Sequence, residues 1–230
     1  MVSRGERSSN KIYAAIAIFV IIIIIFTFLF GGNQIIEAYI ESKYLESNGW
    51  FDSGVRQEPN ERLFGLEKQI SFKYEVEKDD DNHPAFLTVT TIKTLFMMSE
   101  EELLEKTVET INNAAEEENI VLDNESEYTG WRVLSNGHKT HYITYNGTDI
   151  STNTTEDIVI IGETWNCAMS GTSIICIGFA QLTDNASGNT NKNYTHLAEI
   201  VGDKEGTFVN RFNSFEFIKS DGLIFNVKCH

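Results

Sequence analysis

The chain has 230 residues with 34 acidic and 18 basic side chains, which gives a formal net charge of −16 at pH 7. So negative a chain repels phosphate backbones and anionic headgroups, and nucleic-acid binding is therefore not expected. Two prolines in the whole chain argue against an extended proline-rich stalk.

The N-terminal region predicts a single membrane anchor. Residues 12–30, IYAAIAIFVIIIIIFTFLF, carry no charge, and as a helix they span about 28 Å, close to the hydrocarbon thickness of a bilayer. The basic side chains of Arg4, Arg7 and Lys11 precede this run, so the positive-inside rule places residues 1–11 in the cytoplasm. The rest of the chain is then expected outside the cell membrane, as an extracytoplasmic domain.

Two other outcomes stay open for this apolar run. A secretory signal peptide would be cleaved behind it, although FTFLFGGNQ offers no convincing cleavage motif. A pilin-type signal would be cleaved near SRGER and would leave the apolar helix as the stem of a filament subunit. The polar residues between Gly5 and Ile12 weaken this pilin-like interpretation.

Residues 33–64 are expected to connect the anchor to the outer domain. Apolar residues recur with a helical period from Asn33 to Gly49, which predicts a juxtamembrane helix, and an irregular linker follows it. The outer domain then covers residues 65–230.

Strand and helix patterns alternate in the outer domain. A capping box, Ser99 with Glu102, predicts the start of a helix over 99–119. Asn136–Gly137 is the strongest short hairpin signal of the chain. By composition and apolar period, we also expect a hairpin of strands at 66–77 and 85–97, a hairpin at 130–147, and strands at 156–167 and 172–181. A second helix is expected at 195–212, and residues 213–218 and 223–229 are expected to form closing strands or an extended tail.

This order of elements predicts an α+β fold class, with helices packed on a mostly antiparallel sheet. The run TWNCAMSGTSIICIGFA, the helix after it and NSFEF resemble the end of PsbP-like domains. That resemblance implies an α/β/α sandwich over residues 65–218. The stretches GLEK, LTVTTIKT, CIGFAQ and VGDKEGTFVN are also similar to uncharacterised membrane-anchored surface proteins of archaea, a family that implies no function.

The cysteines of the hairpin at 156–181 predict a disulfide. If Gly171 and Thr172 form a two-residue turn, Cys167 faces Cys176, and opposed Cα atoms roughly 4.5 Å apart suit a disulfide. A turn one residue earlier would leave the two cysteines as diagonal neighbours about 7–8 Å apart, too far to bridge comfortably. An outer compartment permits the bond. A bridge to Cys229 and three buried thiols are the alternatives.

Other residues show no recognisable site. Signatures of nucleophiles, zinc hydrolases and phosphate-binding loops are absent, and no cofactor is predicted. His138 and His141 lie three apart in a predicted strand, so they face opposite sides and cannot chelate one ion together. Cys229 and His230 match the end of a haem-attachment motif, but Asn226 stands where its first cysteine belongs, so the match is interpreted as a coincidence.

An acidic loop and five glycosylation triplets are the remaining candidates. Asp79, Asp80 and Asp81 offer carboxylate oxygens to Ca²⁺, yet their spacing is not that of a dedicated calcium loop, so only a weak site is expected. The Asn-x-Ser/Thr triplets lie downstream of the anchor, in polar segments, at Asn124, Asn146, Asn153, Asn185 and Asn193.

These observations predict a non-enzymatic, membrane-anchored extracytoplasmic binding or accessory domain of the cell envelope, with a protein or a glycan as its partner. A surface hydrolase or redox enzyme whose site forms only in the fold is one alternative. The pilin-like filament subunit is another. The sequence does not indicate an oligomeric state.

Overall fold

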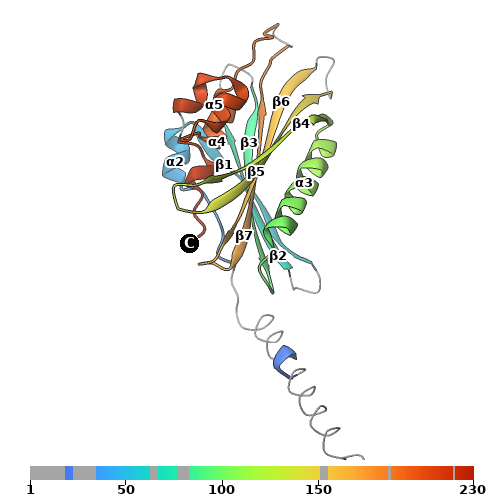
Figure 1. Ribbon diagram of the computed structural model, residues 1–230, viewed down its shortest axis with the longest axis vertical. Helices are drawn as coiled ribbons and strands as arrows, with labels where there is room; N and C mark the ends of the chain where they lie inside the picture. Colours follow the sequence, from blue (N-terminus) through green and yellow to red (C-terminus); the bar gives the residue numbers. More distant parts are fainter. Residues whose placement is uncertain are drawn as a thin grey trace, which may run out of the picture.

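The computed structural model is shown in Figure 1 and describes residues 19–22, 35–62, 67–76, 83–150, 155–185, 188–219 and 221–230. The predicted cytoplasmic tail, residues 1–11, and most of the predicted membrane span lie outside these ranges. Among the residues described, no helix is both long and apolar enough to cross a bilayer.

A seven-stranded sheet forms the centre of the described part of the chain (Figure 1). All neighbouring strands are antiparallel, and their order across the sheet is β1-β2-β3-β7-β6-β5-β4. The strands are β1 (Trp50–Arg62), β2 (Glu67–Val76), β3 (Ala85–Thr94), β4 (Ile120–Val133), β5 (Lys139–Asp149), β6 (Glu156–Cys167) and β7 (Thr172–Gln181).

Helices lie on both faces of this sheet. Helix α3 (Glu100–Glu117) packs on one face, over β6, β7 and the neighbouring strands (Figure 1). The opposite face carries short elements, which are α2 (Ser42–Ser47), α4 (Thr195–Val201), α5 (Thr207–Phe212) and the 3-10 helices η2 (Phe215–Lys219) and η3 (Ile224–Asn226).

Strands β6 and β7 are apolar on successive residues because both of their faces are buried. Ile158 and Ile160 belong to the core beneath α3, whereas Val159 and Ile161 belong to the core beneath α4. The apolar pattern of this hairpin predicts two covered faces, and the structure confirms it.

Three local predictions are also confirmed. Strands β2 and β3 form the first expected hairpin, and β4 and β5 form another around Asn136 and Gly137. Helix α3 begins with the expected capping box: the Glu102 backbone N–H donates to Ser99 Oγ at 3.2 Å, and the Ser99 N–H donates to the Glu102 carboxylate at 2.8 Å.

The predicted fold class, an α+β sandwich of the α/β/α type found in PsbP-like domains, is wrong. The structure is a seven-stranded antiparallel sheet with few helices. The described strands have 10 to 14 residues each, whereas α3 alone among the described helices has more than seven. More of the chain is in strands, and less of it in helices, than the sequence patterns predict.

The largest error lies before β2. Of the helix predicted from Asn33 to Gly49, the structure retains only α2. The predicted linker forms the edge strand β1, because Trp50 is buried and pairs with Val76 of β2. The segment forms a strand because it pairs with β2, although its apolar residues follow no clear period.

The region after β7 differs as well. The predicted helix at 195–212 is divided into α4 and α5, because Gly202 and Gly206 have φ values of +59° and +77°, which end a right-handed helix. The segments predicted as closing strands or an extended tail, 213–218 and 223–229, contain the 3-10 helices η2 and η3, and an extended bridge follows only at Lys228.

Gly162 of β6 allows helix α3 to approach the sheet closely. A Cβ on this residue would lie 2.5 Å from Thr107 Cγ2 and 2.9 Å from Ile111 Cδ1. Carbon atoms in contact are normally about 3.5–4.0 Å apart. The helix therefore packs on bare backbone at this position.

Gly162→Ala should lower the free energy of unfolding by about 1–3 kcal/mol, because the added methyl overpacks this contact. Combining it with Thr107→Ser should recover part of that loss, since serine removes the clashing methyl and keeps the hydroxyl that donates to the Leu103 carbonyl at 2.7 Å. Chemical denaturation of both variants and of Thr107→Ser alone measures the effect. Unchanged stability of Gly162→Ala would contradict this packing.

Candidate metal centre

The β6–β7 hairpin places Cys167 at the end of β6, paired with Thr172 at the start of β7. Four residues form the loop between them, and the Gly171 N–H donates to the Cys167 carbonyl at 2.9 Å. Gly171 has a φ of +65°, so its left-handed backbone falls at the last loop position. The predicted two-residue turn is therefore wrong, and the strands pair four residues away from the predicted register.

The predicted disulfide between Cys167 and Cys176 does not form in this register. Cys176 pairs with Glu163, and it lies four residues, or about 13 Å, beyond Thr172 along β7. All three cysteines of the chain are free and buried. Burial and the Glu163 carboxylate raise the pKa of Cys176, which keeps it a protonated and unreactive thiol.

Cys167 instead meets Cys229. Residues 227–230 run antiparallel to the segment before α2: the Tyr39 N–H donates to the Lys228 carbonyl at 2.9 Å, and the Lys228 N–H donates to the Tyr39 carbonyl at 2.8 Å. Cys229 is buried next to this bridge, and its Sγ lies 2.8 Å from the Sγ of Cys167.

Two histidines complete a thiol–imidazole cluster, defined as His138, Cys167, Cys229 and His230. His138 lies in the β4–β5 turn, with its Nε2 3.2 Å from the Sγ of Cys229 and its ring 6.2 Å from that of Trp165. The Nδ1 of His230 lies 3.4 Å from the sulfur of Cys167 and 3.5 Å from that of Cys229. The four possible ligand atoms all lie within 4.8 Å of one another.

Three of the S···N distances within the cluster are close to those of a tetrahedral metal site, whereas the S···S distance is shorter. A tetrahedral zinc ion with Zn–S near 2.3 Å and Zn–N near 2.0–2.1 Å implies S···N edges of about 3.5 Å and an S···S edge of about 3.8 Å. Three of the four S···N distances are 3.2, 3.4 and 3.5 Å. The sulfur atoms, 2.8 Å apart, are closer than that edge but farther than the roughly 2.05 Å of a disulfide. The placement of both imidazoles favours a metal over a disulfide.

The surroundings of the cluster favour the metal-binding forms of Cys167 and His138, but they disfavour the thiolate of Cys229. Burial raises the pKa of Cys167, but hydrogen bonds involving Cys229, Ser170 and His230 outweigh burial and lower the pKa overall. Burial and the neighbouring Cys167 raise the pKa of Cys229, so one thiol of the pair ionises first. Burial, followed by the nearby His230, lowers the pKa of His138. His138 is therefore a neutral imidazole at neutral pH, which is the form that coordinates a metal.

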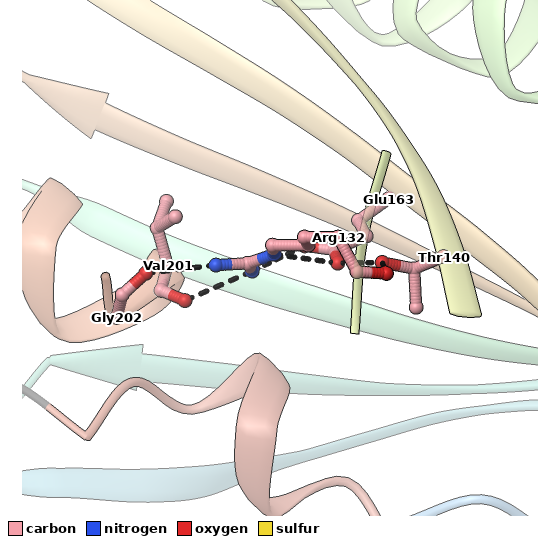
Figure 2. Close-up of polar contacts among 5 residues, drawn as sticks. All are labelled: Arg132, Thr140, Glu163, Val201 and Gly202. Carbon is pink, nitrogen blue, oxygen red and sulfur yellow. Dashed lines mark hydrogen bonds and ion pairs between the residues drawn. The ribbon is translucent and has the colours of Figure 1, made fainter. Parts of the chain in front are cut away.

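Arg132 and Glu163 form a buried ion pair (Figure 2). It lies on the same face of the sheet as the thiol–imidazole cluster. Arg132 of β4 donates to both carboxylate oxygens of Glu163 in β6, and its Nε–Oε1 distance is 2.8 Å. The guanidinium also donates to the carbonyls of Val201 and Gly202, at 2.9 and 2.8 Å. Thr140 of β5 donates its hydroxyl to Glu163. The network thus joins three strands to the end of α4.

This network positions the strands that carry the cluster. Arg132 and Thr140 are directly paired across the β4–β5 hairpin, whose turn contains His138. Glu163 lies four residues before Cys167 on the same face of β6. The ion pair therefore keeps the turn with His138 in register with the strand that ends at Cys167.

Glu163→Gln should lower the free energy of unfolding by about 3–5 kcal/mol, because it leaves the Arg132 guanidinium buried without a counter-ion. The double variant Arg132→Met/Glu163→Leu should lose less, since no charge remains buried. Lys192→Gln is the control, because it breaks an exposed ion pair with Asp157 and should cost about 1 kcal/mol or less. Denaturant titration compares the three, and equal losses in Glu163→Gln and Lys192→Gln would contradict this role.

His138 lies in the turn before β5 and His141 lies within β5, and the two side chains are in contact with different residues. His141 stacks on Trp131 with ring centroids 4.0 Å apart, near Glu100 of α3. His138 faces Trp165 and the cluster. The two histidines therefore belong to different environments and cannot share one ion.

The other predicted site residues do not come together. The weak calcium candidates Asp79, Asp80 and Asp81, and the sequon residue Asn153, lie outside the described residues. The remaining sequon residues are exposed in β4 and β5 or partly exposed after β7, at Asn124, Asn146, Asn185 and Asn193. Calcium binding and glycosylation stay predictions.

Sequence reasoning missed the cluster because its members are distant in the chain. Cys167 and Cys229 are 62 residues apart, and His138 and Cys229 are 91 apart. The adjacent pair Cys229–His230 is the local signal, because both residue types ligate metals, but nothing in the local sequence places Cys167 or His138 beside it.

Comparison of the chain with protein-family models, characterised proteins and solved structures finds no match. The similarity to archaeal surface proteins therefore stays a prediction.

Proposed function

We propose that this chain is a non-enzymatic, membrane-anchored protein whose extracytoplasmic domain binds a zinc ion through the thiol–imidazole cluster. One observation carries this proposal: two thiols and two imidazoles converge within 4.8 Å from the β4–β5 turn, the β6–β7 hairpin and residues 227–230. Four ligands of the types that zinc prefers meet in one place although they come from three separate segments.

The chemistry of the ligands favours zinc. Two thiolates and two imidazoles form one of the common tetrahedral zinc sets, whereas calcium and magnesium take oxygen ligands. Because the protein supplies all four ligands, no coordination position is left for water or substrate, and this supports binding over hydrolysis. Copper(I) also accepts thiolates and imidazoles, so it is the competing ion.

The membrane anchor is part of the proposal and is supported by the uncharged run at 12–30. The segment that follows is attached next to the cluster, where Tyr39 pairs with Lys228. The Ala38 N–H also donates to Thr91 Oγ1 at 2.8 Å. A bound metal would therefore stabilise the segment that links the domain to its anchor.

The full-length chain in detergent should bind one Zn²⁺ per molecule, measured by calorimetry and by metal analysis after gel filtration. Cys167→Ala and Cys229→Ala should abolish stoichiometric binding, because each removes a thiolate ligand. Cys176→Ala is the matched control and should bind zinc as the wild type does. His138→Gln should weaken binding and His141→Gln should not. Parallel titration with copper(I) identifies the preferred ion.

A structural disulfide between Cys167 and Cys229 is the second candidate, favoured by the 2.8 Å separation of their sulfur atoms and by an oxidising outer compartment. Non-reducing peptide mapping that links these two residues, with no zinc uptake after reduction, would replace the zinc proposal with this one. Stoichiometric zinc uptake by Cys167→Ala would show that the cluster is not the site.

Protease added to intact cells should remove the domain after residue 34 and leave an N-terminal tag on residues 1–11 protected, because the positive-inside rule places that tail in the cytoplasm. Immunoblotting for the tag measures the outcome, with a cytoplasmic protein as the control for intact membranes. Complete protection of the domain would rule out the proposed topology.

A further inference from the structure

A second site lies at the other end of strand β6 from the thiol–imidazole cluster. It is a cavity of about 210 Å³ between β5, the start of β6, the segment after β7 and the end of α5. Asp157 in its wall and Cys167 in the cluster are ten residues apart along β6, about 33 Å. The cavity is therefore independent of the metal centre.

Part of the cavity wall is apolar and aromatic, although most of its lining residues are polar. Leu182 is buried, and beside it lie Tyr194 and Phe212, whose ring centroids are 5.5 Å apart. Binding sites for small molecules commonly combine such an apolar wall with a few polar groups that set the orientation of the ligand. A compact ring would find apolar contact surface here.

The charged groups of the cavity leave one positive charge unbalanced. Asp157, Lys192 and Arg211 are its charged lining residues. The Nζ of Lys192 lies 3.0 Å from a carboxylate oxygen of Asp157, so these two neutralise each other. The charge of Arg211 remains, in a chain whose formal net charge is −16.

Arg211 has few partners for a guanidinium that is partly buried. It donates one hydrogen bond, to the Ser126 carbonyl at 2.7 Å, and its guanidinium carbon lies 4.9 Å from the ring centre of Tyr128 and 5.8 Å from that of Phe212. Its Nε is buried and has no acceptor, and no carboxylate of the described residues forms an ion pair with it. A partly buried cation without a counter-ion costs some stability, and an anion in the cavity would offset that cost.

We propose that this cavity binds a small organic anion, with one carboxylate or phosphate group facing Arg211 and a compact ring against Tyr194 and Phe212. The planar fork of an arginine matches the oxygen atoms of both groups. The cavity is smaller than the roughly 300–1,000 Å³ typical of sites for drug-sized ligands, which limits the anion to about the size of a single sugar acid or sugar phosphate.

The test uses the full-length chain in detergent, produced in a host without N-glycosylation so that Asn146 in the cavity wall stays unmodified. Calorimetry with glucuronate, glucose 6-phosphate and neutral glucose should show saturable binding of at least one anion and none of glucose. Binding of glucuronate would indicate a carboxylate ligand, and binding of glucose 6-phosphate would indicate a phosphate ligand. No saturable binding of either anion would overturn the proposal.

Arg211→Gln should weaken binding of that anion by about tenfold or more, because it removes charge-assisted hydrogen bonds. Arg211→Lys keeps the charge but not the fork, so its affinity should be intermediate. Lys204→Gln removes an equal charge from an exposed pair with Asp221 and should bind like the wild type. Equal affinity of Arg211→Gln and wild type would refute the role of Arg211.

If Arg211→Gln does not fold, chemical modification of the wild-type protein tests the same proposal. Phenylglyoxal modifies arginine side chains, and a bound anion should slow its reaction with Arg211, as mapped by mass spectrometry. Glucose should give no protection. Reaction of Arg211 at the same rate with and without the anion would also overturn the proposal.

Discussion

Arg132 and Glu163 are buried almost completely, with side-chain exposures of 4% and 0%, and each charge depends on the other. Removing two charges from water is offset only where their remaining donors and acceptors are also satisfied. Here the guanidinium also bonds the carbonyls of Val201 and Gly202, and Thr140 donates to the carboxylate. Apolar contacts between the same strands would tolerate a shift in strand register, whereas the hydrogen bonds of this ion pair form in one register only. The pair therefore sets the register of β4, β5 and β6 and the position of α4.

The thiol–imidazole cluster depends on that register. His138 lies in a turn, and its position relative to Cys167 follows from how β4 and β5 align with β6. Residues 227–230 reach the same place through their bridge to Tyr39. Polar contacts of defined geometry thus bring the four side chains together, whereas the apolar contacts around them provide most of the burial.

Features that depend on sequence neighbours were predictable, and features that depend on distant residues were not. The capping box at Ser99 and the hairpin at Asn136 are local. The pairing of β6 with β7 is different, because a shift by an even number of residues leaves every side chain on its original face. The apolar pattern fits the predicted and the observed registers equally, so it cannot show that Cys167 faces Thr172. Cys229 reaches the site only through the tertiary fold.

The attachment of residues 38–40 has a mechanical consequence for a domain held at its N-terminal side. The Ala38 N–H bonds Thr91 of β3, and the Ile40 N–H bonds the Tyr74 hydroxyl of β2 at 3.0 Å. A force applied to the chain before residue 35 therefore reaches inner strands of the sheet before it reaches the edge strand β1. Strand β1 is shielded from peeling, and the load is shared by hydrogen bonds to two inner strands and to residues 227–230.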